Sequence, residues 1–342
     1  MRFLSYLGRR ALFFLPQIVG ILLVTFIFVR MIPGDPAKLM AGPLMPEEGV
    51  ELIRERMGLN KPLPIQFFYY IRNVAHGDLG VSWYTGNPVM DDIRVRLPAT
   101  IELLGLALLA TFLIMLPIAI KSASMGKGVV QRVSRKVFYG YGMAASAFPD
   151  FWLGLILIFI FYAVLGWAPA PVGQLDIQLS APTRITGMHL VDGLLTGNWP
   201  VFISSLTHLI LPVFVLTFVY GGVICKMAIV TATEVQNSEH INFAKVSGLP
   251  VSKIEGYVTR AVYPPVATIT AVTWAFLIGG AVLVETVFSW GGFGQYAVQS
   301  IINSDFAAIQ GVVLISALLN LIIYILVDMI YFWVDPRIKS LG

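Results

Sequence analysis

Two acidic residues lie within or directly after long apolar stretches of the sequence, where charged residues are rare. Asp150 lies inside the apolar stretch 137–167, and Glu285 directly follows the uncharged stretch 262–284. A carboxylate inside a membrane can carry a proton, bind an ion or line the path of a solute. Each residue also has a structural interpretation, in which Asp150 caps a turn after a helix break at Pro149 and Glu285 is solvated at a helix end. The candidate residues of a translocation pathway or gate are Asp150, Trp152 and Glu285, of which Trp152 is also interpreted as a packing aromatic.

A second group of residues suits contact with another protein rather than catalysis. The stretch NFAKVSGLPVSKI, residues 242–254, is too polar to span a bilayer and has the pattern of a helix, a stop and a second helix. Gly248 suits the left-handed position that ends a helix, and Pro250 prevents the helix from continuing. Ser252 and Glu255 have the spacing of a capping box, which predicts the start of the second helix. Small residues on the first helix would let the groove of another protein approach its backbone; the alternative is a plain loop with one fraying helix.

The sequence lacks the common motifs of catalytic and metal sites. MGKG at residues 125–128 misses the upstream glycine and the hydroxyl residue of a phosphate-binding loop, and GVSWY at residues 80–84 misses the second glycine of a nucleophile elbow. No HExxH motif occurs, the four histidines are scattered without metal-ligand spacing, and Cys225 is the single cysteine. We therefore expect no catalytic residue, no metal site and no enzymatic activity. Uphill transport would then need energy from a partner protein or from an ion gradient.

These candidate residues must be positioned by membrane helices. Of the 342 residues, 57% are hydrophobic and only 12% are charged, whereas soluble domains are about 25% charged. The mean hydropathy is +0.79. A hydrocarbon core of about 30 Å needs about 20 apolar residues per helix, so the sequence predicts an all-α, polytopic membrane protein with six transmembrane helices. The six apolar stretches are residues 11–29, 103–120, 137–167, 206–225, 262–284 and 306–327.

Basic residues in short loops predict which side of the membrane each loop faces. Three arginines and no acid precede the first apolar stretch, and residues 121–136 carry five basic residues and no acid. By contrast, residues 168–205 carry one basic residue and residues 289–305 carry none. Both termini are therefore expected in the cytoplasm. The expected organisation is a transmembrane helix in residues 1–32, an extracytoplasmic subdomain of short helices and turns in 33–98, a core of five transmembrane helices with a cytoplasmic loop (226–262) in 99–336, and a cytoplasmic tail in 337–342.

Nine short motifs follow one another along the chain. They are IPGDP (32–36), HGDLG (76–80), RLPATIEL (96–103), FPDFWLG (148–154), HLILP (208–212), GGAVLVETVF (279–288), GGFG (291–294), QGVVL (310–314) and VDMIYFWVDPRI (327–338). In this order they resemble the permease subunits of binding-protein-dependent ABC importers, in the branch for dipeptides, oligopeptides and nickel. Departures are small: Asp150 stands where a small polar residue is common, and Gly291 stands where proline is common.

The stretch FAKVSGL is similar to the EAA loop of these permeases, which forms the coupling helix that docks into a cleft of the ATPase subunit. Ala244 and Gly248 match the alanine and glycine of that loop, while Asn242 and Phe243 depart from its glutamate and alanine. Lys245 stands where peptide permeases often carry arginine. The resemblance implies that Ala244 and Gly248 let the cleft close, that Leu249 is an apolar plug and that Lys245 is a charge contact. The ATPase-coupling residues that it implies are Ala244, Lys245, Ser247, Gly248, Leu249 and, more weakly, Lys253.

The resemblance also implies a fold and a set of partners. It implies the type I ABC importer permease fold, in a multi-pass protein of a prokaryotic inner membrane that pairs with a homologous second permease. Two ATPase subunits would hold ATP and Mg²⁺, so this chain would bind no cofactor itself. An extracytoplasmic binding protein would deliver the solute, and the other contacts would be with membrane lipid and not with nucleic acid. The solutes of the family include dipeptides, oligopeptides, glutathione, nickel and oligosaccharides, and the sequence does not select among them.

Two other classes of membrane protein stay open on the residues alone. A secondary transporter driven by an ion gradient would use Asp150 and Glu285 as ion or proton sites and would need no ATPase. A membrane enzyme would need a catalytic cluster, and the sequence shows none. The long outer segment and the cytoplasmic helix pair favour the importer over both.

Overall fold

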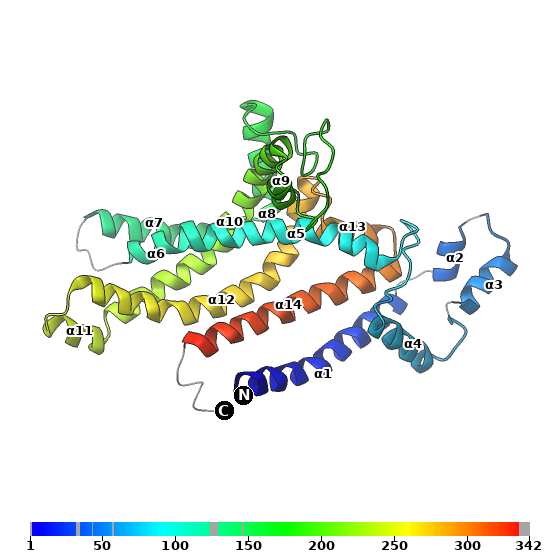
Figure 1. Ribbon diagram of the computed structural model, residues 1–342, viewed down its shortest axis with the longest axis horizontal. Coiled ribbons are helices and arrows are strands. Elements are labelled where there is room, and N and C mark those ends of the chain that lie inside the picture. Colours follow the sequence, from blue (N-terminus) through cyan, green and yellow to red (C-terminus); the bar gives the residue numbers. More distant parts are fainter. Residues whose placement is uncertain are drawn as a thin grey trace. The chain divides into compact units, whose positions relative to one another are not determined.

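The chain folds into helices joined by turns and loops (Figure 1). The computed structural model describes residues 2–31, 35–42, 44–56, 58–123, 129–145 and 147–334. Within these ranges every regular element is helical, and the only extended pairing is an isolated bridge between Val81 and Pro88. The predicted all-α class is confirmed. Two compact units are present, Met1–Leu97 with Gln295–Leu321 and Pro98–Gly294 with Ile322–Gly342.

The first unit combines the N-terminal helix with the short helices expected in residues 33–98. Asp35 caps one of them by accepting a hydrogen bond from the N–H of Ala37 (3.0 Å), and it pairs with the guanidinium of Arg54. Residues 32–34 of the IPGDP motif lie outside the described residues. The unit contains α1 (Arg2–Met31), α2 (Pro36–Ala41), α3 (Glu47–Arg56), α4 (Leu63–Ala75), the start of α5 (Val89–Ala110), most of α13 (Phe293–Ile302) and the first part of α14 (Phe306–Val334).

Buried carboxylates join distant parts of the sequence within this unit. Asp305, just before α14, is 1% exposed and accepts a hydrogen bond from the hydroxyl of Ser82. Asp92 of α5 accepts hydrogen bonds from the hydroxyls of Thr85 and of Tyr296 in α13 (3.3 Å for the latter). Buried polar groups that are paired in this way rigidify a structure. The turn that precedes α5 is therefore fastened to α13 and to the start of α14.

Two helices of unusual length form the centre of the second unit. The helix α10 (Trp199–Gln236) has 38 residues and α12 (Val251–Val287) has 37, so each is about 56 Å long. A hydrocarbon core is about 30 Å thick, which means that both helices continue well beyond it. The other elements of the unit are the rest of α5, the π-helical segment Thr111–Met115, α6 (Leu116–Ser122), α7 (Val129–Ala145), α8 (Asp150–Leu157), the π-helical segment Ile158–Val164, α9 (His189–Leu195), α11 (Glu239–Val246) and the end of α14.

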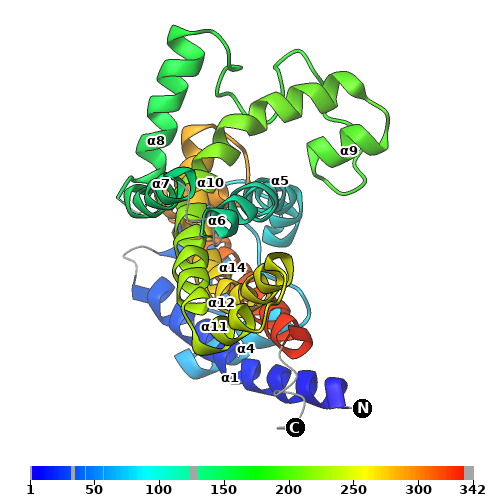
Figure 2. The same cartoon turned by 90° about the vertical axis from the view of Figure 1, so that its left-hand side faces the viewer.

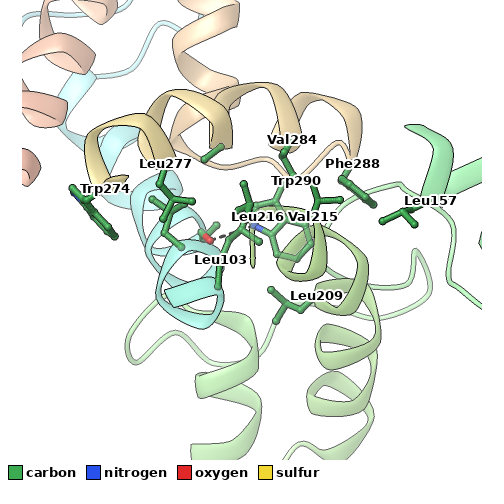
Figure 3. Packing of buried hydrophobic residues seen from close by; sticks show 14 residues of the cluster. Leu103, Leu157, Leu209, Val215, Leu216, Trp274, Leu277, Val284, Phe288 and Trp290 are labelled. Carbon is green, nitrogen blue, oxygen red and sulfur yellow. Dashed lines mark hydrogen bonds between the residues drawn. The ribbon is translucent and has the colours of Figure 1, made fainter. Parts of the chain in front are cut away.

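Apolar side chains from α5, α10 and α12 form the larger core of the second unit (Figure 3). Trp290 follows α12, is 2% exposed and lies in one cluster with Leu103 of α5 and Leu216 of α10. Its indole N–H donates a hydrogen bond to the carbonyl of Ala99 (3.2 Å). A buried tryptophan needs such a partner for its N–H. The turn after α12 is therefore anchored to α5.

The structure contains five helices that are long and apolar enough to cross a membrane, or six if one bent pair counts as a single span. The bent pair corresponds to the predicted span 137–167, in which Val133–Ala145 and Asp150–Val164 meet at 105°. Pro149 is the N-cap of α8, and a proline has no N–H with which to continue a preceding helix. Five of the six predicted spans are thus confirmed as single helices, and the bent pair stands in place of the sixth. The side of the membrane on which the termini lie stays a prediction.

Candidate functional site

The helix α11 ends in a turn that its own backbone closes. Ser247 is the C-cap, and Gly248 follows with a φ of +75°. The N–H of Gly248 donates to the carbonyl of Lys245 (3.1 Å), and the N–H of Leu249 donates to the carbonyl of Ala244 (3.1 Å). These two bonds make a Schellman motif, which satisfies carbonyls that the helix end would otherwise leave unpaired. The predicted short helix and its left-handed glycine are confirmed.

One side of α11 packs against the chain itself. Ile241 is fully buried and Ala244 is 8% exposed, and both belong to one cluster with Ile254 of α12. Leu249 is partly buried against the same cluster. The resemblance implies that Ala244 and Leu249 contact another protein, yet in this structure they hold α11 against α12. A direct contact of Ala244 or Leu249 with another protein would require α11 to separate from α12 at this face.

The opposite side of α11 presents apolar side chains to the outside. Phe243 is 74% exposed and Val246 is 88% exposed, and residues three apart lie on the same face of a helix. Ser247 and Gly248 are also exposed. Neither Phe243 nor Val246 is among the residues implied by the resemblance, because Phe243 departs from the family pattern. The spacing of residues along the helix could have identified this exposed face, because residues 243 and 246 face outward when Ile241 and Ala244 face inward.

Lys245 is tied back to the neighbouring helix. Its ammonium donates a hydrogen bond to the carbonyl of Gln236 at the end of α10 (3.1 Å), where a positive charge complements the helix dipole. The side chain of Gln236 in turn donates to the carbonyl of Ala123, just after α6. Lys253 lies exposed in the first turn of α12. A contact of either lysine with another protein stays a prediction.

The second helix of the predicted pair begins earlier than the sequence indicates. The helix α12 starts at Val251 with Pro250 as its N-cap and no side-chain hydrogen bond at the cap. The predicted capping box at Ser252 and Glu255 is therefore wrong. The carbonyl of Pro250 accepts hydrogen bonds from the N–H groups of residues 253 and 254 (3.0 and 3.2 Å), so the proline that stops one helix also begins the next.

Asp150 lies at the break between α7 and α8 and is held by two hydrogen bonds. It is 8% exposed, and its carboxylate accepts from the N–H of Phe151 (2.7 Å) and from the hydroxyl of Tyr220 on α10 (2.8 Å). A Cβ atom on Gly280 would lie 2.2 Å from an Asp150 carboxylate oxygen and 1.8 Å from the Tyr220 oxygen. Glycine is thus required for α12 to approach this pair. Asp150 therefore joins α8, α10 and α12 after a helix break, and its place on a solute path stays a prediction.

Trp152 belongs to a row of aromatic side chains next to Asp150. The rings of Phe148 and Trp152 stack with centroids 5.7 Å apart, and Phe148 lies 6.5 Å from Phe218, which stacks on Phe214 at 5.9 Å. Trp152 is 45% exposed. The row therefore offers an exposed aromatic surface for lipid, a second protein or a solute.

Glu285 is fully buried near the end of α12, so the interpretation that it is solvated at a helix end is wrong. It accepts a hydrogen bond from the hydroxyl of Thr100 on α5, and that hydroxyl accepts one from the N–H of Phe293 (2.8 Å). The GGFG turn closes over the carboxylate, because a Cβ on Gly292 would lie 2.5 Å from one of its oxygens. Glu285 thus fastens the turn after α12 to α5. A role as a gate stays a prediction.

The candidate pathway residues do not form one site. Asp150 contacts α12 at Gly280, and Glu285 is five residues further along the same helix, which turns it about 140° around the helix axis. In the described parts of the chain, no group of three or more His, Cys, Asp or Glu side chains converges to hold a metal ion. The chain therefore presents separate helix junctions and, on α11, an exposed apolar face.

Known proteins match both parts of the chain. The sequence pattern of the family described as "binding-protein-dependent transport system inner membrane component" matches residues 115–340, and the pattern for the N-terminal part of such membrane components matches residues 3–104. The probable D,D-dipeptide transport system permease protein of Escherichia coli is 38% identical over 100% of this chain and 99% of its own length. The di/tripeptide transport system permease protein of Pseudomonas aeruginosa is 35% identical, and the glutathione transport system permease protein of Pectobacterium atrosepticum is 30% identical, each over 98% of this chain and 99% of its own length.

These matches extend over nearly the whole sequence, including the N-terminal helix, residues 33–98 and the core. They confirm the family that the nine motifs resemble and the location in the inner membrane as a multi-pass protein. The chain therefore belongs to the binding-protein-dependent transport system inner membrane components, and it is a permease subunit of an ABC importer.

Proposed function

We propose that this permease forms one half of a membrane pathway for dipeptides or similarly small peptides. The observation that carries the proposal is the end-to-end likeness to relatives named for D,D-dipeptides and for di- and tripeptides. A homologous second permease would complete the pathway, two ATPase subunits would drive it, and an extracytoplasmic binding protein would deliver the peptide. The glutathione permease among the relatives supports the same class, because glutathione is itself a small peptide.

The helix α11 would receive the movement of an ATPase and pass it to α12. Its outer face offers Phe243 and Val246, and exposed apolar side chains of this size favour contact with a protein. Its inner face is fixed to α12 through Ile241 and Ala244. A displacement of α11 would therefore move α12, which crosses the membrane, as a lever. In this arrangement Ala244 and Leu249 transmit the movement, and Phe243 and Val246 make the contact.

The termini and α11 would lie in the cytoplasm, where ATP is available. The five basic residues of 121–136 favour that side for the connection after α6. The hydrogen bond from Gln236 to the carbonyl of Ala123 joins the end of α10 to the same connection. This bond supports placing α11 on the basic side, because α11 follows α10 directly. The same reasoning assigns residues 33–98 to the outside.

ATP and Mg²⁺ would be held by the ATPase subunits and not by this chain. The sequence lacks a phosphate-binding loop, and the relatives are named as permeases. The chain would thus be a non-catalytic subunit whose part in the cycle is mechanical. Asp150, Trp152 and Glu285 would act in it through helix junctions, with the exposed Trp152 nearest to a solute path.

Transport by the reconstituted complex tests the proposal. Proteoliposomes containing both permeases and both ATPases would be given the binding protein and a radiolabelled dipeptide. We expect uptake that requires ATP on the side of the membrane where the ATPase subunits lie. This uptake should continue when a protonophore removes the proton gradient. Uptake that follows an imposed proton gradient without ATP would support the gradient-driven alternative. If ATP drives the uptake of another solute and of no dipeptide, the assignment of the substrate to small peptides is contradicted, while the assignment to ABC importers stands.

A further inference from the structure

Helices α7 and α10 pack against each other in the second unit (Figure 2). A groove lies between their side chains. Near the helix break they approach closely, because a Cβ on Gly222 would lie 2.5 Å from the Cβ of Ala145, and one on Gly142 would lie 2.9 Å from the Cβ of Lys226. The groove begins within one turn of the contact between Gly142 and Lys226, where Tyr139 and Val230 carry larger side chains. The space that opens there has a volume of about 470 Å³.

The floor of this groove is apolar along its length. It is formed by the ring of Tyr139 and by Gly140 on α7, with Val230 on α10. The adjoining surface of α7 is apolar as well, since Val133 is 52% exposed and Val137 is 60% exposed. An exposed apolar surface on a membrane helix is typical of contact with lipid chains.

One end of the groove carries two positively charged side chains. Arg135 and Lys136 line it, and neither forms an ion pair with any residue that the structure describes. Within the same described residues, the buried Nε of Arg135 has no hydrogen-bond acceptor. A third cation, the ammonium of Lys226, lies 5.8 Å from the centroid of the Tyr139 ring.

One carboxylate, that of Glu234, also lines the groove, but it makes no ion pair with these cations in the described part of the chain. Arg135 and Lys136 thus line the groove with one carboxylate, and Lys226 lies next to the lining residue Tyr139. A buried N–H of a charged group that lacks an acceptor costs free energy. The charged end of the groove is thus complementary to an anion, and its floor is complementary to a hydrocarbon chain.

We propose that this groove binds an anionic phospholipid. The phosphate of the headgroup lies against Arg135 and Lys136, and an acyl chain follows the floor formed by Tyr139, Gly140 and Val230. Basic pockets between transmembrane helices suit such headgroups, whereas a soluble phosphate would use only the charged end. The bound lipid fills the space between α7 and α10 beyond their glycine contact. It holds α7 against α10 on the N-terminal side of the break at Asp150.

Lipid binding by the purified full-length chain tests this site. Native mass spectrometry in a neutral detergent would compare phosphatidylglycerol with phosphatidylcholine of the same acyl chains. We expect tighter binding of phosphatidylglycerol, and a loss of about tenfold in its affinity in the double variant Arg135→Gln with Lys136→Gln. The matched control is Lys121→Gln, an exposed basic residue outside the groove, which should bind as the wild type does. Equal binding of the two lipids, or an unchanged double variant, would overturn the proposal.

A second variant tests the acyl-chain part with the charges intact. A Cβ on Gly140 would have no atom within 4 Å, and leucine favours a helix over glycine, so Gly140→Leu should fold and fill the floor. We expect it to lose phosphatidylglycerol, whereas Gly105→Leu, which also has open space, should keep it. Glycerol phosphate, which has no chains, should fail to displace the lipid. Displacement by glycerol phosphate at matched concentration would mark a site for soluble anions and would contradict the lipid assignment.

Discussion

The chain interrupts its helices at Gly248 and at Asp150, and the two breaks are built in different ways. At Gly248 the backbone closes the turn through bonds to the carbonyls of Lys245 and Ala244. At Asp150 the turn is closed by a side chain from another helix, because the carboxylate accepts the hydroxyl of Tyr220. The first turn needs only its own residues, whereas the second depends on how three helices pack.

This difference fits different tasks in a transport cycle. A self-contained turn can stay intact while α11 moves, which is what a docking element requires. The turn at Asp150 can change only if α8, α10 and α12 change together, because Gly280 packs directly on the bonded pair. The comparison therefore predicts that substitutions at the Asp150 junction reduce stability, while substitutions on the outer face of α11 reduce coupling and leave stability unchanged.

The largest effect on stability is expected for Gly280→Ala. Its new methyl group would overlap with Tyr220 and Asp150, so the hydrogen bond must break or α12 must shift. Overpacking together with an unpaired buried carboxylate should cost about 3 kcal/mol. Thermal unfolding in detergent measures the loss. The neighbouring Gly279→Ala is the matched control, since a Cβ there has no atom within 4 Å. Equal losses of stability in the two variants would mean that close packing of Gly280 on Asp150 and Tyr220 is not the cause.

The largest effect on coupling is expected for Val246→Asp on the outer face of α11. A carboxylate in an apolar docking contact should reduce peptide uptake at least tenfold, which corresponds to about 1.4 kcal/mol. The free energy of unfolding should change by no more than about 0.5 kcal/mol, as is usual for surface substitutions. Uptake and ATP hydrolysis by the reconstituted complex are the measurements. The control is Ile302→Asp, because Ile302 is 75% exposed and belongs to α13 in the first compact unit, not to α11. Normal uptake in Val246→Asp would remove this face from the docking surface.

A smaller effect is expected for the hydrogen bond between Tyr220 and Asp150 itself. Tyr220→Phe leaves the carboxylate without its cross-helix partner and should cost about 1–2 kcal/mol of unfolding free energy. Asp150→Asn keeps an acceptor oxygen for the tyrosine and should cost less. If Asp150→Asn keeps stability but loses uptake, the charge itself acts on the solute or on the conformational change. If both variants are as stable as the wild type, the bond is not what holds the junction.

The smallest effect is expected for Gly248→Ala. At a φ of +75°, a Cβ costs about 1 kcal/mol, and nothing within 4 Å adds a clash. We expect a slight loss of helicity in α11 and a partial loss of uptake, both smaller than those of Val246→Asp. Amide hydrogen exchange in α11 would report the local opening. An uptake defect larger than that of Val246→Asp would show that the turn, and not the exposed face, limits coupling.

The sequence predicted the features that depend on local chemistry. Apolar stretches of sufficient length predicted the spans, and Gly248 with Pro250 predicted the end of α11, because each signal lies within a few residues of the structure it specifies. The predicted capping box was wrong because Pro250 alone begins α12. Helices α10 and α12 extend beyond the predicted apolar stretches 206–225 and 262–284, since polar residues outside the membrane continue a helix as readily as apolar ones.

Features that depend on tertiary packing were beyond a single sequence. Tyr220 is 70 residues from its partner Asp150, and no local pattern connects them. The burial of Glu285 depends on Thr100 and on the turn that follows α12. Whether Ala244 faces outward or inward depends on how α11 rests on α12. The motif thus located α11, and only the packing distinguished its exposed face from its buried one.

Cysteine cross-linking to the ATPase tests the central claim that this chain couples through the exposed face of α11. The buried Cys225 is the single native cysteine, so Cys225→Ser provides the background for Val246→Cys and for Ile241→Cys, which lies on the buried face of α11. Single cysteines would be scanned across the ATPase surface in the assembled transporter, and a bifunctional thiol reagent would be added. We expect a cross-link from Val246→Cys that depends on the nucleotide state, and none from Ile241→Cys. A cross-link from Ile241→Cys, with none from Val246→Cys in any nucleotide state, would contradict the claim.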